Sequence, residues 1–268
     1  MCGEALYKYA ASCTIFAATR SIQAAVGDFQ YGAGRSGGAA LQLAEVHAEA
    51  LANPEDALAS LDVRNAFGAI SWADALRIIT AVAPKLAPFL SVIWSPGHQV
   101  IWTQATQPGQ WMAAAICGSL VQGGPEAHYV FCLVMAEVLR DVQRSMDASA
   151  HPDSTSTAHP DSTSTANDPA TPAPTNTISL FLWAYVDDIT FKCRLPLLCE
   201  MLRTMRSALS RYGCELQPKK CNICVPNLRD VPAAQWPTGL LGAALMGFNI
   251  NNSVLPLLGS DAAAAHAV

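Results

Sequence analysis

The stretch that decides the fold is the candidate hairpin Ser179-Leu-Phe-Leu-Trp-Ala-Tyr-Val-Asp-Asp-Ile-Thr-Phe-Lys-Cys193. Apolar and aromatic residues fill both of its halves, which is typical of two short strands inside a sheet. The turn between them is predicted at Val186, Asp187 and Asp188. The sequence therefore places two adjacent carboxylates at the tip of a buried hairpin.

A third acid extends this pattern. Asp62 lies near the end of the short apolar segment 57–63, which is consistent with another buried strand. Close carboxylates raise one another's pKa unless a cation lies between them, so a neighbouring strand that carries Asp62 would complete a site for Mg²⁺. Two such ions can clamp the attacking and leaving oxygens of a phosphoryl transfer. An Asp-Asp pair alone suits an ordinary turn equally well, so the surrounding motifs have to decide.

The remaining chain has the periodicities of a mixed α+β protein. Apolar residues at helical spacing predict helices over 5–26, 39–52, 71–82, 125–146 and 197–212. Turn signals predict a β-hairpin region over 91–117, and short strands are expected over 215–225 and 240–250. An octapeptide at 151–158 recurs unchanged at 159–166, so the low-complexity insert 147–177 is expected to be a disordered loop.

The composition is that of a globular protein. Of 268 residues, 51% are hydrophobic and 14% charged, which suits one large domain or two small ones. A net charge of -5 argues against a surface that binds phosphate everywhere. Eight basic residues nevertheless lie between Lys192 and Arg229, with only Glu200 and Glu215 as acids. This stretch is either a binding surface for a phosphate backbone or a solvated helix face.

Cysteine usage and the start of the chain bear on the compartment. The nine cysteines are odd in number and mostly sit in apolar surroundings, so a disulfide framework is not expected. No signal peptide follows Met1, and no apolar run approaches the roughly 20 residues that span a bilayer. We expect a soluble, intracellular protein without a membrane partner, in the nucleus or the cytoplasm; the oligomeric state stays open.

Five motifs in one order carry a family resemblance. The segment 184–188, Ala-Tyr-Val-Asp-Asp, resembles the YxDD signature of reverse transcriptases, and 61–67, Leu-Asp-Val-Arg-Asn-Ala-Phe, is similar to their first acidic motif, especially that of non-LTR retrotransposons. The segments 119–125 and 216–221 resemble their glycine-containing and lysine-bearing motifs, and 241–250 looks like the hairpin that grips the primer. The resemblance covers nearly all of residues 3–250.

The resemblance implies an α+β fold, a polymerase palm whose small antiparallel sheet is backed by helices, with truncated fingers and no evident thumb. Residues 1–56 would be partial fingers with a glycine-rich turn and helix, and 57–250 the palm, interrupted by the insert 147–177. Residues 251–268 would form a C-terminal tail. The implied function is template-directed synthesis of DNA on RNA or DNA with a primer and deoxynucleoside triphosphates.

Catalytic roles follow from the same resemblance. Asp62, Val63, Asp187 and Asp188 would hold two Mg²⁺ ions, which Mn²⁺ can replace, and the primer 3'-OH would attack the α-phosphate of the nucleotide. Lys220 would donate a proton or positive charge to the leaving pyrophosphate. Lys219 is a rival for this role, and the Lys220 side chain would otherwise belong to a solvated surface.

Nucleotide contacts are implied at five positions. Phe67 would be the steric gate that rejects a ribose 2'-OH, and the alternative is that its ring only packs in the core. Gln122 and Gly123 would border the nucleotide and the template. Val63 and Tyr185 would complete the nucleotide site. Where relatives carry Asp, Ser or Cys, this chain has Gly124.

Three alternatives compete with an active polymerase. The chain could be a truncated or inactive retrotransposon fragment, or a non-catalytic palm-like relic or nucleic-acid-binding module. The segment 32–37 also matches the dinucleotide-binding pattern G-x-G-x-x-G and opens a helix, which would suit a Rossmann oxidoreductase that retains NAD. Cys221 and Cys224 form a lone C-x-x-C pair, which is a weak zinc site and is interpreted as structural.

Overall fold

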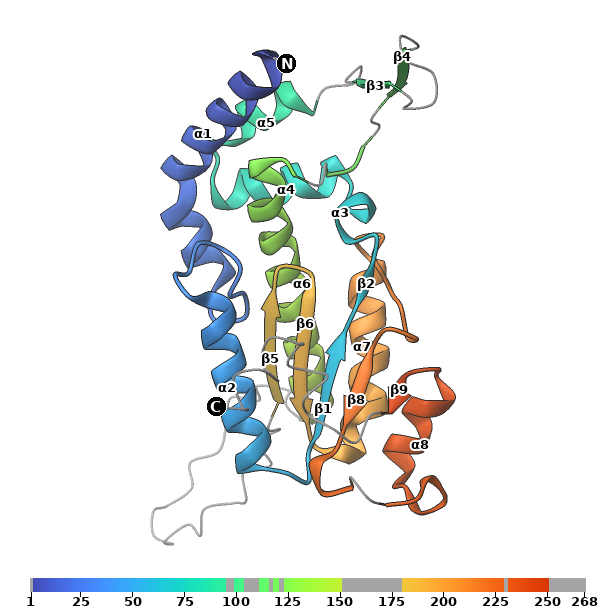
Figure 1. The fold of residues 1–268 in the computed structure, drawn as a ribbon. Coiled ribbons are helices and arrows are strands. Elements are labelled where there is room, and N and C mark those ends of the chain that lie inside the picture. The colour runs from blue at the N-terminus through green and yellow to red at the C-terminus, as the bar shows by residue number, and fades with distance from the viewer. Residues whose placement is uncertain are drawn as a thin grey trace, which may run out of the picture.

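The computed structural model describes residues 2–94, 99–103, 111–115, 118–120, 123–150, 180–228 and 231–250. Its α-helices are α1 (Cys2–Val26), α2 (Gly38–Ala52), α3 (Ala66–Ala69), α4 (Trp72–Val82), α5 (Ala87–Ile93), α6 (Pro125–Ala150), α7 (Leu198–Ser210) and α8 (Thr238–Leu245). The strands are β1 (Ala57–Leu61), β2 (Val63–Arg64), β3 (Gln99–Thr103), β4 (Trp111–Ala115), β5 (Leu180–Tyr185), β6 (Asp188–Cys193), β7 (Glu215–Leu216), β8 (Asn222–Cys224) and β9 (Asn249–Ile250). Figure 1 shows their arrangement.

The main sheet carries the acidic hairpin, β5–β6, along one of its edges. Its strand order is β5-β6-β1-β8-β9, and every pair is antiparallel except β8–β9. In the β1–β6 ladder Leu61 lies opposite Ile189, so the residues that follow β1 and precede Ile189 meet at one end of the sheet. The α+β class and the antiparallel palm sheet that the sequence predicted are confirmed.

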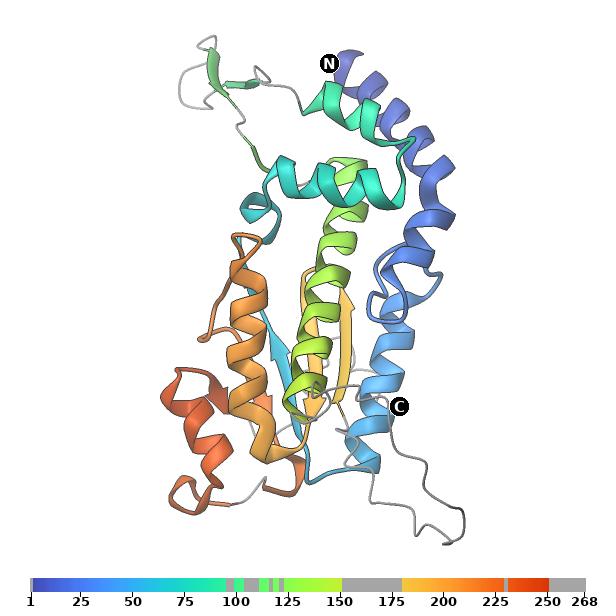
Figure 2. The same ribbon diagram turned by 180° about the vertical axis from the view of Figure 1, so that it is seen from behind.

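Helices cover both faces of this sheet. Helices α6 and α7 lie across one face, as the view from behind shows (Figure 2). Ala59 and Leu61 of β1 belong to the large core on that side, whereas Leu58 points into a smaller cluster on the other face with Val46 and Ala50 of α2. This alternation is the two-residue period of a strand that is buried on both sides.

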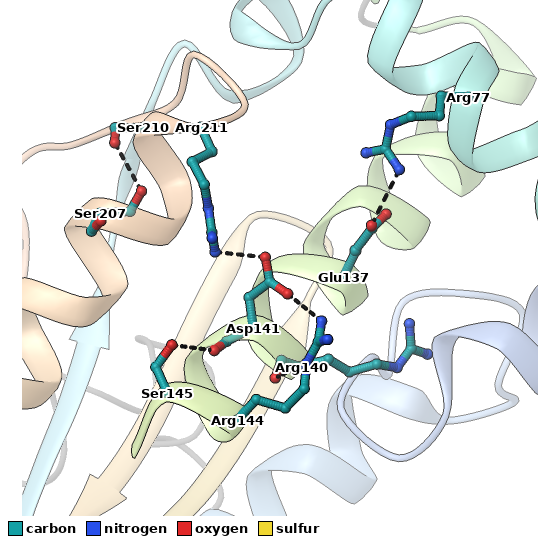
Figure 3. Close-up of polar contacts among 9 residues, drawn as sticks. All are labelled: Arg77, Glu137, Arg140, Asp141, Arg144, Ser145, Ser207, Ser210 and Arg211. Carbon is teal, nitrogen blue, oxygen red and sulfur yellow. Dashed lines mark hydrogen bonds and ion pairs between the residues drawn. The ribbon is translucent and has the colours of Figure 1, made fainter. Parts of the chain in front are cut away.

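Helix α6 is the central helix of the larger layer. It packs against α1, α4 and α7, and its apolar stripe is fully buried. Polar contacts join it to its neighbours (Figure 3). Glu137 accepts a hydrogen bond from Arg77 of α4 at 3.3 Å, and Asp141 accepts hydrogen bonds from Arg144 and, at 2.5 Å, from Arg211 at the end of α7. These pairs link the exposed rims of three helices.

Lys192 does not belong to a basic surface, although the sequence analysis counted it in the basic stretch from Lys192 to Arg229. Its side chain is only 1% exposed, and its ammonium group lies 2.7 Å from a carboxylate oxygen of Glu49 and 3.6 Å from one of Asp56. It also lies over the ring of Phe181, 4.9 Å from the centroid. Lys192 therefore ties α2 to the sheet and is not available to a phosphate backbone.

Several predicted boundaries change. Helix α6 continues to Ala150, so the first four residues of the expected insert, 147–150, are helical, and the rest of the insert lies outside the described residues. Strands β3 and β4 pair as the predicted hairpin, but 91–93 belong to α5. The tail 251–268 lies outside the described residues.

The primer-gripping hairpin predicted at 241–250 is wrong. Helix α8 occupies 238–245, and only the two residues of β9 follow it as a strand, parallel to β8. Pro237 precedes the helix with a φ of -59°, which suits a helix start, and Leu240 and Ala243 are buried at helical spacing. The run of small and apolar residues was ambiguous between the two structures in the sequence.

Within the part of the chain that the structure describes, none of the helices combines the length and apolarity that crossing a bilayer requires.

Candidate active site

The acidic hairpin turns within two residues. Tyr185 at the end of β5 pairs with Asp188 at the start of β6, so Val186 and Asp187 alone form the turn. Val186 has a φ of +58°, in the left-handed region. For an L-residue this conformation costs about 1–2 kcal/mol, and a β-branched side chain rarely adopts it. The turn that carries Asp187 is therefore strained.

Asp62 meets this turn at the end of the sheet. It directly follows β1, whose last residue Leu61 lies opposite Ile189. Its backbone is held on both sides, because its carbonyl accepts a hydrogen bond from the Gln217 amide at 2.9 Å and its amide donates to the sulfur of Cys221 at 3.3 Å. Cys221 is itself fully buried beneath this contact.

The electrostatics of the three acids are coupled. The pKa of Asp188 is raised above its ordinary value, first because burial removes part of its hydration and then because the charges of Asp187 and Asp62 are near. The Oδ2 atom of Asp62 is buried without a hydrogen-bond partner, and the Lys220 ammonium lies 3.9 Å from it. Mutual repulsion and an unpartnered carboxylate oxygen suit a hard divalent cation.

The fit to such a cation rests on this chemistry. All three groups offer carboxylate oxygens, which are the ligands that Mg²⁺ prefers. Among the described residues, no group of three or more His, Cys, Asp or Glu side chains is arranged so that it could hold a metal ion by itself. Asp62 and Asp187 are close enough to raise the pKa of Asp188, and further oxygens, such as those of a phosphate, would complete a set of Mg²⁺ ligands.

A cavity of about 370 Å³ opens beside the acids. Its lining consists of Phe67, Gly123, Gly124, His128, Tyr185, Val186, Asp187 and Asp188. The structure therefore brings together five of the residues that the sequence analysis selected, Phe67, Gly123, Tyr185, Asp187 and Asp188, and adds Gly124, His128 and Val186.

Of the other residues that the sequence analysis selected, some lie near the cavity and one lies outside the described residues. Val63 is buried in β2, where it pairs with Leu216 of β7 next to Asp62. Lys220 lies in the turn after β7, and its amide donates to the Gln217 carbonyl at 2.8 Å. Gln122 lies outside the described residues.

Phe67 is held at the cavity wall by the core. It lies in the short helix α3, whose N-cap residue Asn65 has a φ of +45°. Its ring stacks on that of Phe131 in α6, with centroids 4.7 Å apart. One side of the ring is fixed by packing while the residue lines the cavity, so Phe67 forms a firm edge for whatever enters.

The structure explains the unusual glycine at 124. A Cβ atom at this position would lie 2.7 Å from Oε1 of Glu126 and 3.1 Å from the Tyr7 hydroxyl. Glu126 is buried, and its Oε1 accepts a hydrogen bond from Tyr7 of α1. Burial and this carboxylate raise the pKa of Tyr7. The Tyr7–Glu126 pair therefore takes the space that a side chain at 124 would need.

Sequence reasoning missed the contribution of the glycine-rich segment. The Ala184 amide donates to the Phe29 carbonyl and the Tyr31 amide to the Ala184 carbonyl, both at 2.7 Å. The side chain of Gln30 reaches the backbone of Val186, and the Gly32 carbonyl lies 2.7 Å from Nε2 of His128. The G-x-G-x-x-G pattern was visible in the sequence, but no spacing linked it to residue 186.

The Rossmann alternative is wrong. Its glycine pattern should follow a strand of a parallel sheet, whereas the segment 32–37 follows helix α1 and a single bridged residue, Gln30. The main sheet is antiparallel in three of its four pairs and lacks the order of a doubly wound sheet. The first glycine of the pattern, Gly32, instead allows a close approach to Val186 in the acidic turn.

The chain is similar to a known protein family and to solved structures. The family model described as "Reverse transcriptase (RNA-dependent DNA polymerase)" matches residues 13–245. No curated protein matches the chain. Similar solved structures include telomerase from Candida albicans in complex with a TWJ fragment of telomeric RNA, with 10% identity, a TM-score of 0.48, and coverage of 75% of this chain and 31% of that one. Another is apo telomerase from Candida tropicalis truncated from the C-terminal domain, with 11% identity, a TM-score of 0.43, and coverage of 68% and 34%. The chain thus spans about a third of the length of these structures.

Proposed function

The chain belongs to the reverse transcriptase family, and on this premise we propose that it catalyses template-directed DNA synthesis by two-metal nucleotidyl transfer. The observation that carries the proposal is the meeting of Asp62, Asp187 and Asp188 beside a cavity that Phe67 and Tyr185 also line. Partial burial, and then the nearby charges of Asp187 and Asp62, raise the pKa of Asp188. Acids gathered in this way suit the divalent cations that assist phosphoryl transfer.

The metal ligands in this proposal are the three carboxylates and the backbone carbonyl of Val63. When bound, Mg²⁺ or Mn²⁺ would neutralise charge on the attacking and leaving oxygens. The protein supplies the positions: Asp62 is fixed through its backbone by Gln217 and Cys221. The Lys220 ammonium lies 3.9 Å from a carboxylate oxygen of Asp62 and would place its positive charge near the leaving pyrophosphate.

The nucleotide would enter the cavity between α3 and the acidic turn. Phe67 is the proposed steric gate, since its ring is fixed by Phe131 and cannot easily yield to a 2'-OH. Gly123 and Tyr185 line the same space and would border the incoming deoxynucleoside triphosphate. Gln122 joins them by its place in the glycine-containing motif.

An RNA or DNA template with its primer is the proposed partner. Arg203 and Arg206 of α7 and Lys219 are exposed and offer positive charge that the buried Lys192 does not. An origin in a non-LTR retrotransposon is part of the proposal and rests on the form of the motif at 61–67.

Primer extension tests this function. We compare the intact chain with an Asp187→Asn, Asp188→Asn double variant on an RNA template with Mg²⁺ and deoxynucleotides. A control removes two exposed acids that do not line the cavity, Glu55→Gln and Asp147→Asn. Extension that the control retains and the double variant loses supports the proposal. A chain that binds template but never extends a primer would instead be the non-catalytic nucleic-acid-binding alternative.

A further inference from the structure

The glycine-rich segment between α1 and α2 extends the main sheet up to the acidic turn. Gln30 forms a parallel bridge with Ala184, flanked by the two backbone hydrogen bonds of 2.7 Å that join Ala184 to Phe29 and Tyr31. Figure 1 shows this loop beside β5, in front of the start of α2. The segment therefore lies against the free edge of β5 immediately before Val186 and Asp187.

The side chain of Gln30 completes this contact. Its Oε1 accepts hydrogen bonds from the Val186 amide at 2.8 Å and the Gly32 amide at 2.9 Å, and its Nε2 donates to the Val186 carbonyl at 3.1 Å. The residue is fully buried, at 0% exposure. One side-chain amide thus satisfies both backbone polar groups of the single residue in the turn that has a left-handed conformation.

Gly32 makes this approach possible. A Cβ atom at residue 32 would lie 2.8 Å from Cγ2 of Val186 and 2.9 Å from its amide nitrogen, both closer than real contacts allow. His128, which lines the cavity, holds the Gly32 carbonyl from the other side at 2.7 Å. The turn is therefore enclosed by groups that leave Val186 little freedom to change its backbone conformation.

We propose that Gln30 is a positioning residue for the acidic turn: its amide holds Val186 in the left-handed conformation and thereby directs the carboxylate of Asp187 toward the cavity. A strained turn persists only where its surroundings determine it, and Gln30 supplies two hydrogen bonds to the strained residue Val186. A third, from the Gly32 amide, fixes the Gln30 side chain itself. The inference deepens the proposed polymerase function and rests on it for the role of Asp187.

The test measures binding of Mn²⁺ by electron paramagnetic resonance together with primer extension. Gln30→Leu removes the donor and the acceptor at similar volume. We expect it to weaken Mn²⁺ binding about tenfold, which corresponds to 1.4 kcal/mol, and to lower kcat while leaving the KM for nucleotide unchanged. Adding Val186→Gly should restore part of the binding, because glycine adopts positive φ without the steric cost. A purely structural role for Gln30 would not give this rescue, since the second change only removes further core volume.

The outcomes separate the inference from the proposed function. Wild-type Mn²⁺ affinity in a folded Gln30→Leu variant, or no rescue by Val186→Gly, would overturn the inference alone. Mn²⁺ binding that depends on Asp187 without any primer extension would count against the polymerase function and leave the inference standing. If Gln30→Leu does not fold, Gly32→Ala tests the same point, since it displaces Val186 with Gln30 intact. Unchanged Mn²⁺ affinity in that variant overturns the inference.

Discussion

Lys192→Met should destabilise the fold strongly although it removes a single charge. The side chain is 1% exposed and lies between the carboxylates of Glu49 and Asp56, which are 27% and 9% exposed. Methionine has similar length and can fill the apolar space, so the substitution removes the charge with little loss of packing. It leaves two acids of like charge close together at the junction of α2 and the sheet.

The size of the effect follows from these burials. Breaking a buried ion pair by removing one partner typically costs about 3–5 kcal/mol. Glu49 retains a quarter of its exposure and can regain water, so we expect about 2–3 kcal/mol here, mainly from Asp56. For a chain of this size 1 kcal/mol shifts Tm by about 2–4 °C, which gives a decrease of about 4–12 °C.

Calorimetric melting measures this decrease. The matched control is Lys219→Met, at an exposed lysine, whose unfolding free energy should stay within about 0.5 kcal/mol of the parent value. A triple variant with Lys192→Met, Glu49→Gln and Asp56→Asn should recover much of the loss, because no buried charge then remains unpaired. If Lys192→Met melts like Lys219→Met, the ion pairs do not hold α2 to the sheet and the reasoning fails.

Lys192→Met should not change the salt dependence of nucleic-acid binding, because this side chain is buried. A variant with Arg203→Ala and Arg206→Ala should lower that salt dependence.

Three further changes have definite expected outcomes. Because the folded-state pKa of Asp188 is raised, its stabilising contribution is fully present below pH of about 4 and is lost as pH rises through the raised value. In EDTA, Asp188→Asn should therefore have a higher Tm than the parent at pH 7, and the difference in Tm should close toward pH 4. A difference in Tm that does not depend on pH would contradict the coupling. Phe67→Val should increase incorporation of ribonucleotides relative to deoxynucleotides, measured as the ratio of kcat/KM values, and an unchanged ratio would remove Phe67 from the role of steric gate. Asp141→Asn weakens the contacts with Arg144 and Arg211 shown in Figure 3 and should cost at most about 1 kcal/mol, a loss that urea melts in high salt should no longer detect.

Local patterns in the chain were enough to predict most elements and the order of the acids. Helical spacing located α1, α2, α4, α6 and α7, because each buries an apolar stripe that the sequence displays at a regular period. The hairpin of β5 and β6 was recognisable from its apolar strands around two acids. Helix α8 was not, since a short run of small apolar residues fits a buried strand as well as a helix.

The sequence by itself determined which residues could form the site; only the tertiary structure decided how they are held. Gln30 and Val186 are 156 positions apart, and no periodicity relates them until the segment after α1 joins the edge of β5. In the same way Lys192 counted as a free cation until the register of β6 placed it between Glu49 and Asp56, and Gly124 was unexplained until α1 brought Tyr7 to Glu126. Periodicity reports which face of an element is buried, whereas the partner on that face depends on how distant segments pack.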